Sequence, residues 1–199
     1  MFDFKKEFKD LYNPQCEPAI VTVPEMTFIV VEGKGDPNTS PEYTEAIEIL
    51  YGLSYAIKMS NKPVLEYVVA PLEGFWNSRE ESGPINKDNF VWKMVIRQPD
   101  FVTTSLFEAT QAVVAKKKPT LDLMKANLIK ITEGLCVQVM HVGSYDNEAT
   151  TIAALEEYAT TNGHKFDVGE ERLHHEIYLS DPRKTAVEKL KTVIRYPIK

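Results

Sequence analysis

The sequence predicts an α+β fold in which one strand–helix–strand–strand module occurs twice. Three pairs of segments match one another in the same order along the chain. They are WKMVIRQP (92–99) with LKTVIRYP (190–197), VEGKGD (31–36) with HVGSYD (141–146), and LEYVVAP (65–71) with HEIYLSD (175–181). Matches in a constant order at a consistent offset are typical of an internal duplication. We therefore expect two repeats, at about 19–99 and 127–199, within one domain.

Each repeat is expected to open with a β-hairpin. In the first repeat, residues 21–23 and 27–31 are rich in β-branched side chains and flank a short turn. Residues 127–131 and 135–142 have the same arrangement in the second repeat. Two such runs separated by turn residues predict paired strands.

A helix follows in each repeat. Apolar side chains recur at helical spacing over 42–59 and over 147–161. Between the repeats, Ser105 and Glu108 form a capping box ahead of Pro119. This pattern predicts a linking helix at about 104–118.

Two strands are expected to close each repeat. They are 64–70 with 89–97 in the first repeat, and 173–179 with 191–197 in the second. The first repeat also carries an insertion within 72–89, where Gly, Pro, Asn and Ser predict a loop. Two antiparallel sheets, each backed by helices, should then pack about a pseudo-twofold axis.

Composition argues against several functions. The 199 residues carry a net charge of −6, so no basic field favours nucleic acid or an anionic membrane surface. The N-terminal segment lacks the apolar run of a secretory signal, and no run approaches the roughly 18 apolar residues of a membrane helix. We expect a cytoplasmic protein that contacts neither membrane nor nucleic acid.

No metal or other cofactor is predicted. The adjacent His174 and His175 lie on a predicted strand and must point to opposite faces, which argues against joint metal ligation. His141 and His164 have no partner at ligand spacing. The glycines of GKGDPN complete no nucleotide-binding motif.

The strand HEIYLS presents a candidate site. Ile177 and Leu179 alternate with Glu176 and Tyr178, and we expect the apolar pair to face a helix, leaving Glu176 and Tyr178 on an open side. A desolvated carboxylate beside aromatic rings would suit a lipophilic or cationic ligand and could act as a general base. The alternative is a Glu176 that is solvated or paired with a neighbouring cation.

Other side chains are weaker candidates for the same site. Glu66 aligns with Glu176 in the repeat. Trp92 and Trp76 are either core residues or ligand contacts, and Tyr55 either packs along its helix or enters a pocket. Tyr145 of GSYD is a candidate because a phenol can donate a proton or position water.

The motifs PLEGFW (71–76), IRQPDFVT (96–103), GLCVQVMHVGSYD (134–146) and HEIYLSDPRK (175–184) resemble the GyrI-like small-molecule-binding proteins. The likeness is greatest to the stand-alone bacterial members and covers nearly the whole chain. It implies a ligand cleft between the two repeats, which the 72–89 loop, with Phe75, Trp76, Glu80 and Glu81, either covers as a lid or leaves open. Only about 20 residues precede the first predicted strand, too few for the helix-turn-helix of regulatory relatives.

The resemblance also implies site residues and activities. In multidrug-sensing relatives an acid contacts cationic lipophilic ligands from the strand that matches HEIYLS, and the corresponding residue here is Glu176. Some stand-alone members are hydrolases that protect the host by adding water to the cyclopropane of DNA-alkylating natural products. The family also includes a gyrase-inhibiting protein, so a protein partner such as gyrase is a further alternative.

Two hypotheses follow. The first is a binding protein for lipophilic, aromatic or cationic compounds, active in sequestration or resistance. Its predicted contacts are Glu176, Glu66, Trp92, Trp76, Tyr55, Tyr145 and Tyr178. The alternative is a hydrolase of cyclopropane-bearing electrophiles, with Glu176 as base and Tyr55 or Tyr145 as proton donor or water-positioning group.

Overall fold

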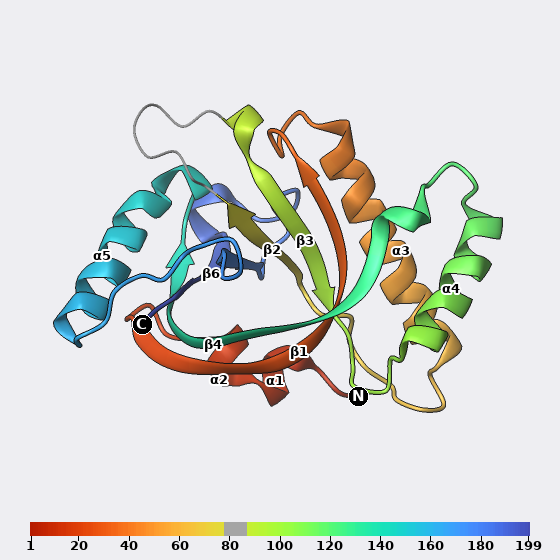
Figure 1. The fold of residues 1–199 in the computed structure, drawn as a ribbon, viewed down its shortest axis with the longest axis horizontal. Helices are drawn as coiled ribbons and strands as arrows, with labels where there is room; N and C mark the ends of the chain where they lie inside the picture. The colour runs from red at the N-terminus through yellow and green to blue at the C-terminus, as the bar shows by residue number, and fades with distance from the viewer. Residues whose placement is uncertain (78–86) are drawn as a thin grey trace. The chain divides into compact units, whose positions relative to one another are not determined.

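The computed structural model describes residues 1–77 and 87–199 and is α+β. Its strands form one closed barrel in the order β1–β3–β2–β5–β6–β4. The prediction of two separate antiparallel sheets is therefore wrong. The reason lies in β1 (Ala19–Lys34) and β4 (Ala126–Val142), which are continuous strands where the sequence predicts hairpins (Figure 1).

The predicted turns fall inside these two long strands. Pro24 lies within β1, and Gly134, with φ of 67°, lies within β4. Neither residue ends its strand, and proline and glycine within strands are typical of edges and bulges. By contacts, the chain forms one compact unit from residues 1–3 and 26–131, and another from 4–25 and 132–199.

In the unit of residues 26–131, β3 (Val91–Arg97) pairs antiparallel with both β1 and β2 (Leu72–Asn77). The predicted strand at 64–70 is wrong, because the closing strand lies later, within the stretch predicted as a loop. The segment LEGFWN has four consecutive buried residues, which is the pattern of a strand covered on both faces. Residues 78–86, and with them Glu80 and Glu81 of the suggested lid, lie outside the described residues.

Two helices belong to the same unit. Helix α3 (Pro41–Ser60) starts with Ser40, whose hydroxyl accepts from the Tyr43 amide, and with proline at the first helical position. Helix α4 (Thr104–Lys117) occupies the predicted linking position, but its N-cap is Thr103 rather than Ser105. Short 3₁₀ turns lie at Lys87–Asn89 (η1) and Leu123–Lys125 (η2).

Gly33 makes room for a tryptophan. It lies directly opposite Trp92 in the β1–β3 ladder, and a Cβ at Gly33 would lie 2.2 Å from the Trp92 ring. The indole is held in place because its Nε1 donates to the Gly35 carbonyl at 3.3 Å and its ring meets Tyr43 edge-on at 5.3 Å. Side chains larger than hydrogen are therefore excluded at position 33.

Gly33→Ala is expected to lower the free energy of unfolding by about 1–3 kcal/mol, because the added methyl group displaces a fixed ring. Gly52→Ala is the matched control. Gly52 lies within α3, and its Cβ would meet only the Lys118 ammonium, at 3.9 Å. That substitution should stabilise the protein by about 0.5–1 kcal/mol. Urea unfolding measures both changes, and equal effects of the two variants would contradict the packing argument.

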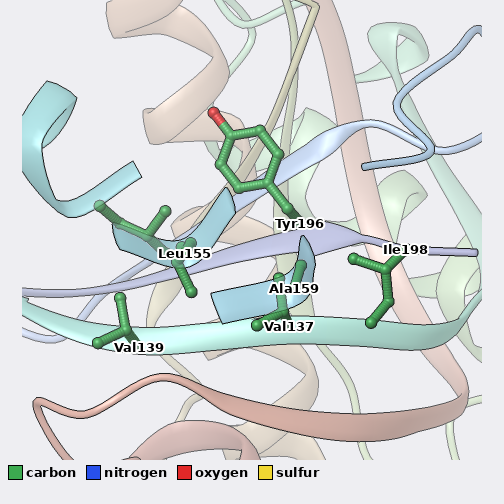
Figure 2. Packing of buried hydrophobic residues seen from close by; sticks show 7 residues of the cluster. Val137, Val139, Leu155, Ala159, Tyr196 and Ile198 are labelled. Atoms are coloured by element: carbon green, nitrogen blue, oxygen red, sulfur yellow. The ribbon is translucent and has the colours of Figure 1, made fainter. Parts of the chain in front are cut away.

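The other unit contains helix α5 (Glu148–Thr161). Strand β6 (Lys191–Pro197) pairs antiparallel with β4 and with β5 (His174–Tyr178). Apolar side chains of α5, β4 and β6 form a core beneath the helix (Figure 2). The members of this core are Val137, Val139, Leu155, Ala159, Ile194, Tyr196 and Ile198.

Short elements complete this unit. They are helices α1 (Phe4–Glu7) and α2 (Lys9–Tyr12) and the 3₁₀ turns η3 (Tyr145–Asn147) and η4 (Val187–Lys189). Both matching closing segments of the sequence, 92–99 and 190–197, contain strands that pair with two neighbours. That the two repeats arose by duplication stays a prediction.

Candidate functional site

Glu176 lies beneath α5 and is only 9% exposed. Its backbone is directly opposite Ile194 on β6, and Ile194 is opposite Val139 on β4. Both of these belong to the core that α5 covers, and directly paired residues share a face of a sheet. The prediction that Ile177 faces the helix and leaves Glu176 on an open side is therefore wrong. Both faces of β5 are buried, so hydrophobicity alone could not identify the helix side.

A second carboxyl group joins Glu176. Glu148, the first residue of α5, is 8% exposed and hydrogen-bonds to Glu176 through its side chain. Burial, and then the charge of Glu176, raise the pKa of Glu148 to about 9. Burial raises the pKa of Glu176 to about 7, against the lowering effect of hydrogen bonds from Tyr178 and Glu148. At neutral pH the protonated Glu148 thus donates to the Glu176 carboxylate.

Three tyrosines lie around this carboxyl pair. The Tyr178 hydroxyl donates to Glu176 Oε2 at 2.7 Å, and the Tyr145 ring meets the Tyr178 ring edge-on at 5.9 Å. Burial, followed by the charges of Glu148 and Glu176, raises the pKa of Tyr145. The pKa of Tyr196 is raised by burial and then by the same two carboxylates. Tyr145 is 38% exposed, so this side of the group is open to solvent.

His174 borders Glu176 along the strand. Its Nε2 lies 3.3 Å from Glu176 Oε1, and its ring stacks on Tyr196 at 4.3 Å. Tyr196 also stacks on Phe166 at 4.3 Å, so two rings contact the phenol. Burial, and then the charge of His175, lower the pKa of His174 to about 3. His174 is therefore a neutral neighbour of Glu176 at physiological pH.

A histidine clamp holds the GSYD turn onto α5. His141 makes one hydrogen bond through Nδ1 to the Thr151 hydroxyl, at 2.8 Å, and another through Nε2 to the Ser144 carbonyl, at 3.0 Å. The turn leaves β4 at Gly143, whose φ of 135° is a conformation that side chains disfavour. These two hydrogen bonds fix the turn from which Tyr145 contacts Tyr178, next to the helix start from which Glu148 contacts Glu176.

The opposite face of β5 carries a buried ionic network. Arg195 Nη1 donates to Glu133 Oε1 at 2.8 Å, and His175 Nδ1 lies 3.0 Å from Glu133 Oε2. Arg195 Nε donates to Gln138 Oε1 at 2.9 Å, and its Nη2 donates to the Leu11 carbonyl at 2.8 Å. Burial opposes ionisation of Glu133, but the charges of His175 and Arg195 prevail and lower its pKa to about 2.

The predicted aromatic contacts of the other unit form a cluster of their own. Trp92 and Trp76 are both buried, and both rings contact Tyr43, at 5.3 and 6.3 Å. Trp76 also meets Phe90 edge-on at 5.8 Å. This packing gives both tryptophans structural neighbours, and their role as ligand contacts stays a prediction.

Tyr55 and Glu66 lie at the surface. Tyr55 is half-exposed on α3, stacks on Tyr51 at 6.2 Å, and has the Lys58 ammonium 5.9 Å from its ring centre. Glu66 lies outside any strand and forms an exposed ion pair with Lys62 at 3.5 Å. The structure thus brings Glu176, Tyr178 and Tyr145 together, and it adds three residues that the sequence did not indicate: Glu148, His174 and Tyr196.

The arrangement suits acid–base chemistry. Two carboxyl groups whose pKa values differ can act as proton donor and proton acceptor at the same pH. Within the described residues, no group of three or more His, Cys, Asp or Glu side chains could hold a metal ion. None of the described helices combines the length and the apolar character needed to cross a membrane.

Glu148→Gln is expected to stabilise the protein at alkaline pH. The folded state holds a proton on Glu148 above the ordinary pKa of 4.5, so wild-type stability falls as pH rises from about 5 towards 9. Glutamine removes this dependence, and the variant should be more stable by about 1–3 kcal/mol at pH 8 and equal to wild type near pH 4.5.

Urea unfolding at both pH values measures this difference. Glu157→Gln, at an exposed position of the same helix, is the control and should change stability by less than about 0.5 kcal/mol. A Glu148→Gln variant that is no more stable than wild type at pH 8 would show that the carboxyl is not held protonated.

The family model of the GyrI-like small-molecule-binding domain matches residues 16–199. The structure of a hydrolase from Listeria innocua is 43% identical to this chain, with a TM-score of 0.92 and 100% of both chains covered. An uncharacterized conserved protein from the same organism is 44% identical, with a TM-score of 0.95 and the same coverage. These matches confirm the resemblance that the motifs indicate.

A more distant structure shows a similar fold. The C-terminal domain of EcmrR is 13% identical, with a TM-score of 0.56, and the match covers 92% of this chain and 97% of that chain. Among curated protein sequences, none matches the chain.

Proposed function

Because the chain belongs to the GyrI-like small-molecule-binding family, we propose that it is a hydrolase that adds water to strained, electrophilic small molecules. The observation that carries this proposal is the buried pair of Glu148 and Glu176, which shares one proton near neutral pH. Pairs of carboxyl groups with displaced pKa values are typical of acid–base catalysis. The relative named a hydrolase, 43% identical over its whole length, supports the same activity.

A cyclopropane fused to a cyclohexadienone is the proposed substrate class. Glu176 takes a proton from water, and the water oxygen bonds to the methylene carbon. One cyclopropane carbon–carbon bond breaks, and its electron pair enters the ring to give a phenolate. Glu148 donates its proton to the former carbonyl oxygen, which leaves a phenol. The product contains one added water, and the hydrogen bond between the carboxyl groups returns the proton from Glu176 to Glu148.

The atoms around the pair fit these roles. Among the described residues, Glu148 Oε1 is a buried oxygen without a hydrogen-bond partner. When the Glu148 proton lies on Oε1 instead of on the oxygen that faces Glu176, this atom can donate to a substrate carbonyl. Tyr178 fixes the orientation of the Glu176 carboxylate through its hydrogen bond. The half-exposed Tyr145 offers a ring face to a flat substrate at the solvent side. Protection of the cell from such alkylating compounds is the proposed physiological role.

The test is incubation with a duocarmycin-type cyclopropane compound, followed by mass spectrometry beside a no-protein sample. Conversion of more than one equivalent to the product with one added water supports the hydrolase. Recovery of intact compound, together with tight binding, contradicts it and favours the second candidate, a protein that sequesters lipophilic, aromatic or cationic compounds. That candidate is motivated by the ionised Glu176 among aromatic rings, which can attract a cation.

The rate of the proposed reaction should depend on pH with a bell-shaped profile. Glu176 must be ionised, so kcat/KM should rise through about pH 7, and Glu148 must be protonated, so it should fall through about pH 9. The two limbs belong to the coupled pair rather than to separate residues. Initial rates from pH 5 to 10 measure the profile, and a rate independent of pH over this range would contradict the assigned roles.

A further inference from the structure

We infer that the buried network of Arg195, Glu133 and His175 is a positioning device that keeps Glu176 ionised beside a protonated Glu148. This inference rests on the proposed function, because it assigns the base and the acid of that reaction. His175 and Glu176 are consecutive residues of β5, with Cα atoms about 3.8 Å apart, and their side chains leave the strand on opposite faces.

The network holds positive charge directly behind Glu176. The two oxygens of Glu133 contact different partners: Oε1 accepts from Arg195 at 2.8 Å, and Oε2 lies 3.0 Å from His175 Nδ1. Arg195 Nη1 also lies 3.3 Å from His175 Nδ1, and the Glu133 carboxylate contacts both groups. A carboxylate in contact with an imidazole favours the protonated ring. With His175 protonated, two cations and one carboxylate give a net charge of one. The side chains of Arg195 and His175 are fully buried, so solvent screens this charge weakly.

The charge acts unequally on the two carboxyl groups. Burial raises the pKa of Glu176, and the charge of His175 opposes that rise. Burial also raises the pKa of Glu148, but there the charges of Glu176 and Asp146 add to the rise. The network therefore separates two otherwise similar acids, and Glu176 becomes the one that ionises first.

Other titratable groups face the pair from each surrounding element. His174 and Tyr178 on β5 lie beside Glu176, and Asp146 on η3 acts on Glu148. Tyr196 on β6 and Tyr145 on η3 border the pair, and Glu156 on α5 and Asp181 after β5 act on these two tyrosines. His174 is neutral, and the carboxylates among these groups favour protonation of Glu176. The ionised base is favoured first by the hydrogen bond from Tyr178 and then by positive charge on the opposite face of the strand.

The first measurement uses wild-type protein and does not require activity. With ¹⁵N-labelled histidine, NMR should show both ring nitrogens of His175 protonated between pH 6 and 8. With ¹³C-labelled glutamate, the Glu176 carboxyl should titrate at lower pH than that of Glu148. A neutral His175 at pH 7, or the reverse order of the two carboxyls, overturns the inference even if no variant folds.

The second measurement uses His175→Asn, which keeps a nitrogen donor towards Glu133 and removes the charge. The Glu176 titration midpoint should rise by about one pH unit, as expected for a charge roughly 10 Å away in a buried environment. The acidic limb of kcat/KM should move by the same amount, so that the rate below pH 6 falls about tenfold. His164→Asn, beyond the end of α5, is the control and should leave both midpoints in place.

The outcomes separate the two proposals. If His175→Asn hydrolyses the dienone and its Glu176 titration midpoint equals that of wild type, this inference is overturned and the proposed function stands. If His175→Asn shifts the Glu176 titration midpoint but the wild-type protein does not hydrolyse the dienone, the proposed function is overturned, and with it the catalytic part of the inference. A shift of the Glu176 titration midpoint together with the acidic limb of the kcat/KM profile supports both the inference and the proposed function.

Discussion

Replacement of Glu176 by glutamine is expected to lower kcat/KM for a cyclopropane-bearing dienone by about 10²–10⁴-fold, the usual contribution of a general base. Glutamine has the same shape and can still accept the hydrogen bond from the Tyr178 hydroxyl, but it cannot take a proton from water. The loss should therefore appear in kcat, with a small change in KM. Product formation followed by mass spectrometry gives both constants.

Glu157→Gln is the matched control for this experiment. It makes the same chemical change on an exposed surface of α5 and should retain full activity. The Glu176→Gln variant should also be at least as stable as wild type, because it removes a carboxylate that burial disfavours. Unchanged turnover in a folded Glu176→Gln protein would remove Glu176 from the mechanism.

Arg195→Met is expected to cost about 3–5 kcal/mol in the free energy of unfolding, as does the loss of one partner from other buried ion pairs. Arg195 is fully buried and donates to Glu133, to Gln138 and to the Leu11 carbonyl. Methionine fills a similar volume but donates to none of them. Glu133 would retain only its contact with His175, at 3.0 Å.

The control is Arg183→Met, which removes an arginine that is also ion-paired, with Asp181 at 2.9 Å. The Arg183 side chain is 84% exposed, so the change should be below about 1 kcal/mol. Urea unfolding at pH 7 measures both variants. Similar losses in the two would show that burial of Arg195 does not determine its contribution.

The alternation of side chains along HEIY was predictable from the sequence. It places Glu176 and Tyr178 on one face and His175 on the other, as the hydrogen bond from Tyr178 to Glu176 requires. The helix-covered face of the strand could not be deduced, because ionic groups are buried on one side and the carboxyl pair on the other. Hydrophobic patterning identifies a core only where polar residues remain in solvent.

Glu148 could not be found from sequence spacing. It lies at the start of a helix, a position where an acid is ordinary because it complements the helix dipole. Only the packing of α5 over β5 and β6 makes it a partner of Glu176. Sequence spacing argues against His174 as a metal ligand together with His175, but it does not indicate the actual neighbours of His174. These neighbours, Tyr196 and Glu176, come from pairing and stacking that no local pattern encodes.

The alignment of Glu66 with Glu176 illustrates a different error. Glu176 lies opposite Ile194 in the β5–β6 ladder, and the residue opposite the corresponding Ile96 is Leu72. Self-alignment places the insertion after the strand, whereas the structure places the strand inside the stretch with loop-like composition. A shift of a few residues between repeats is enough to pair chemically similar but spatially unrelated side chains.

The hydrogen bond from Arg195 to the Leu11 carbonyl has a consequence for the order of events during synthesis. The two residues are 184 positions apart, so the N-terminal helices are complete on the ribosome long before their anchor on β6 has been made. Helices of four residues are not stable alone in water. Residues 26–131 have most of their contacts within one contiguous stretch, so we expect them to fold first as the chain emerges. The unit that carries Glu176 must await the last strand, β6, and until then its opening segment lacks this anchor.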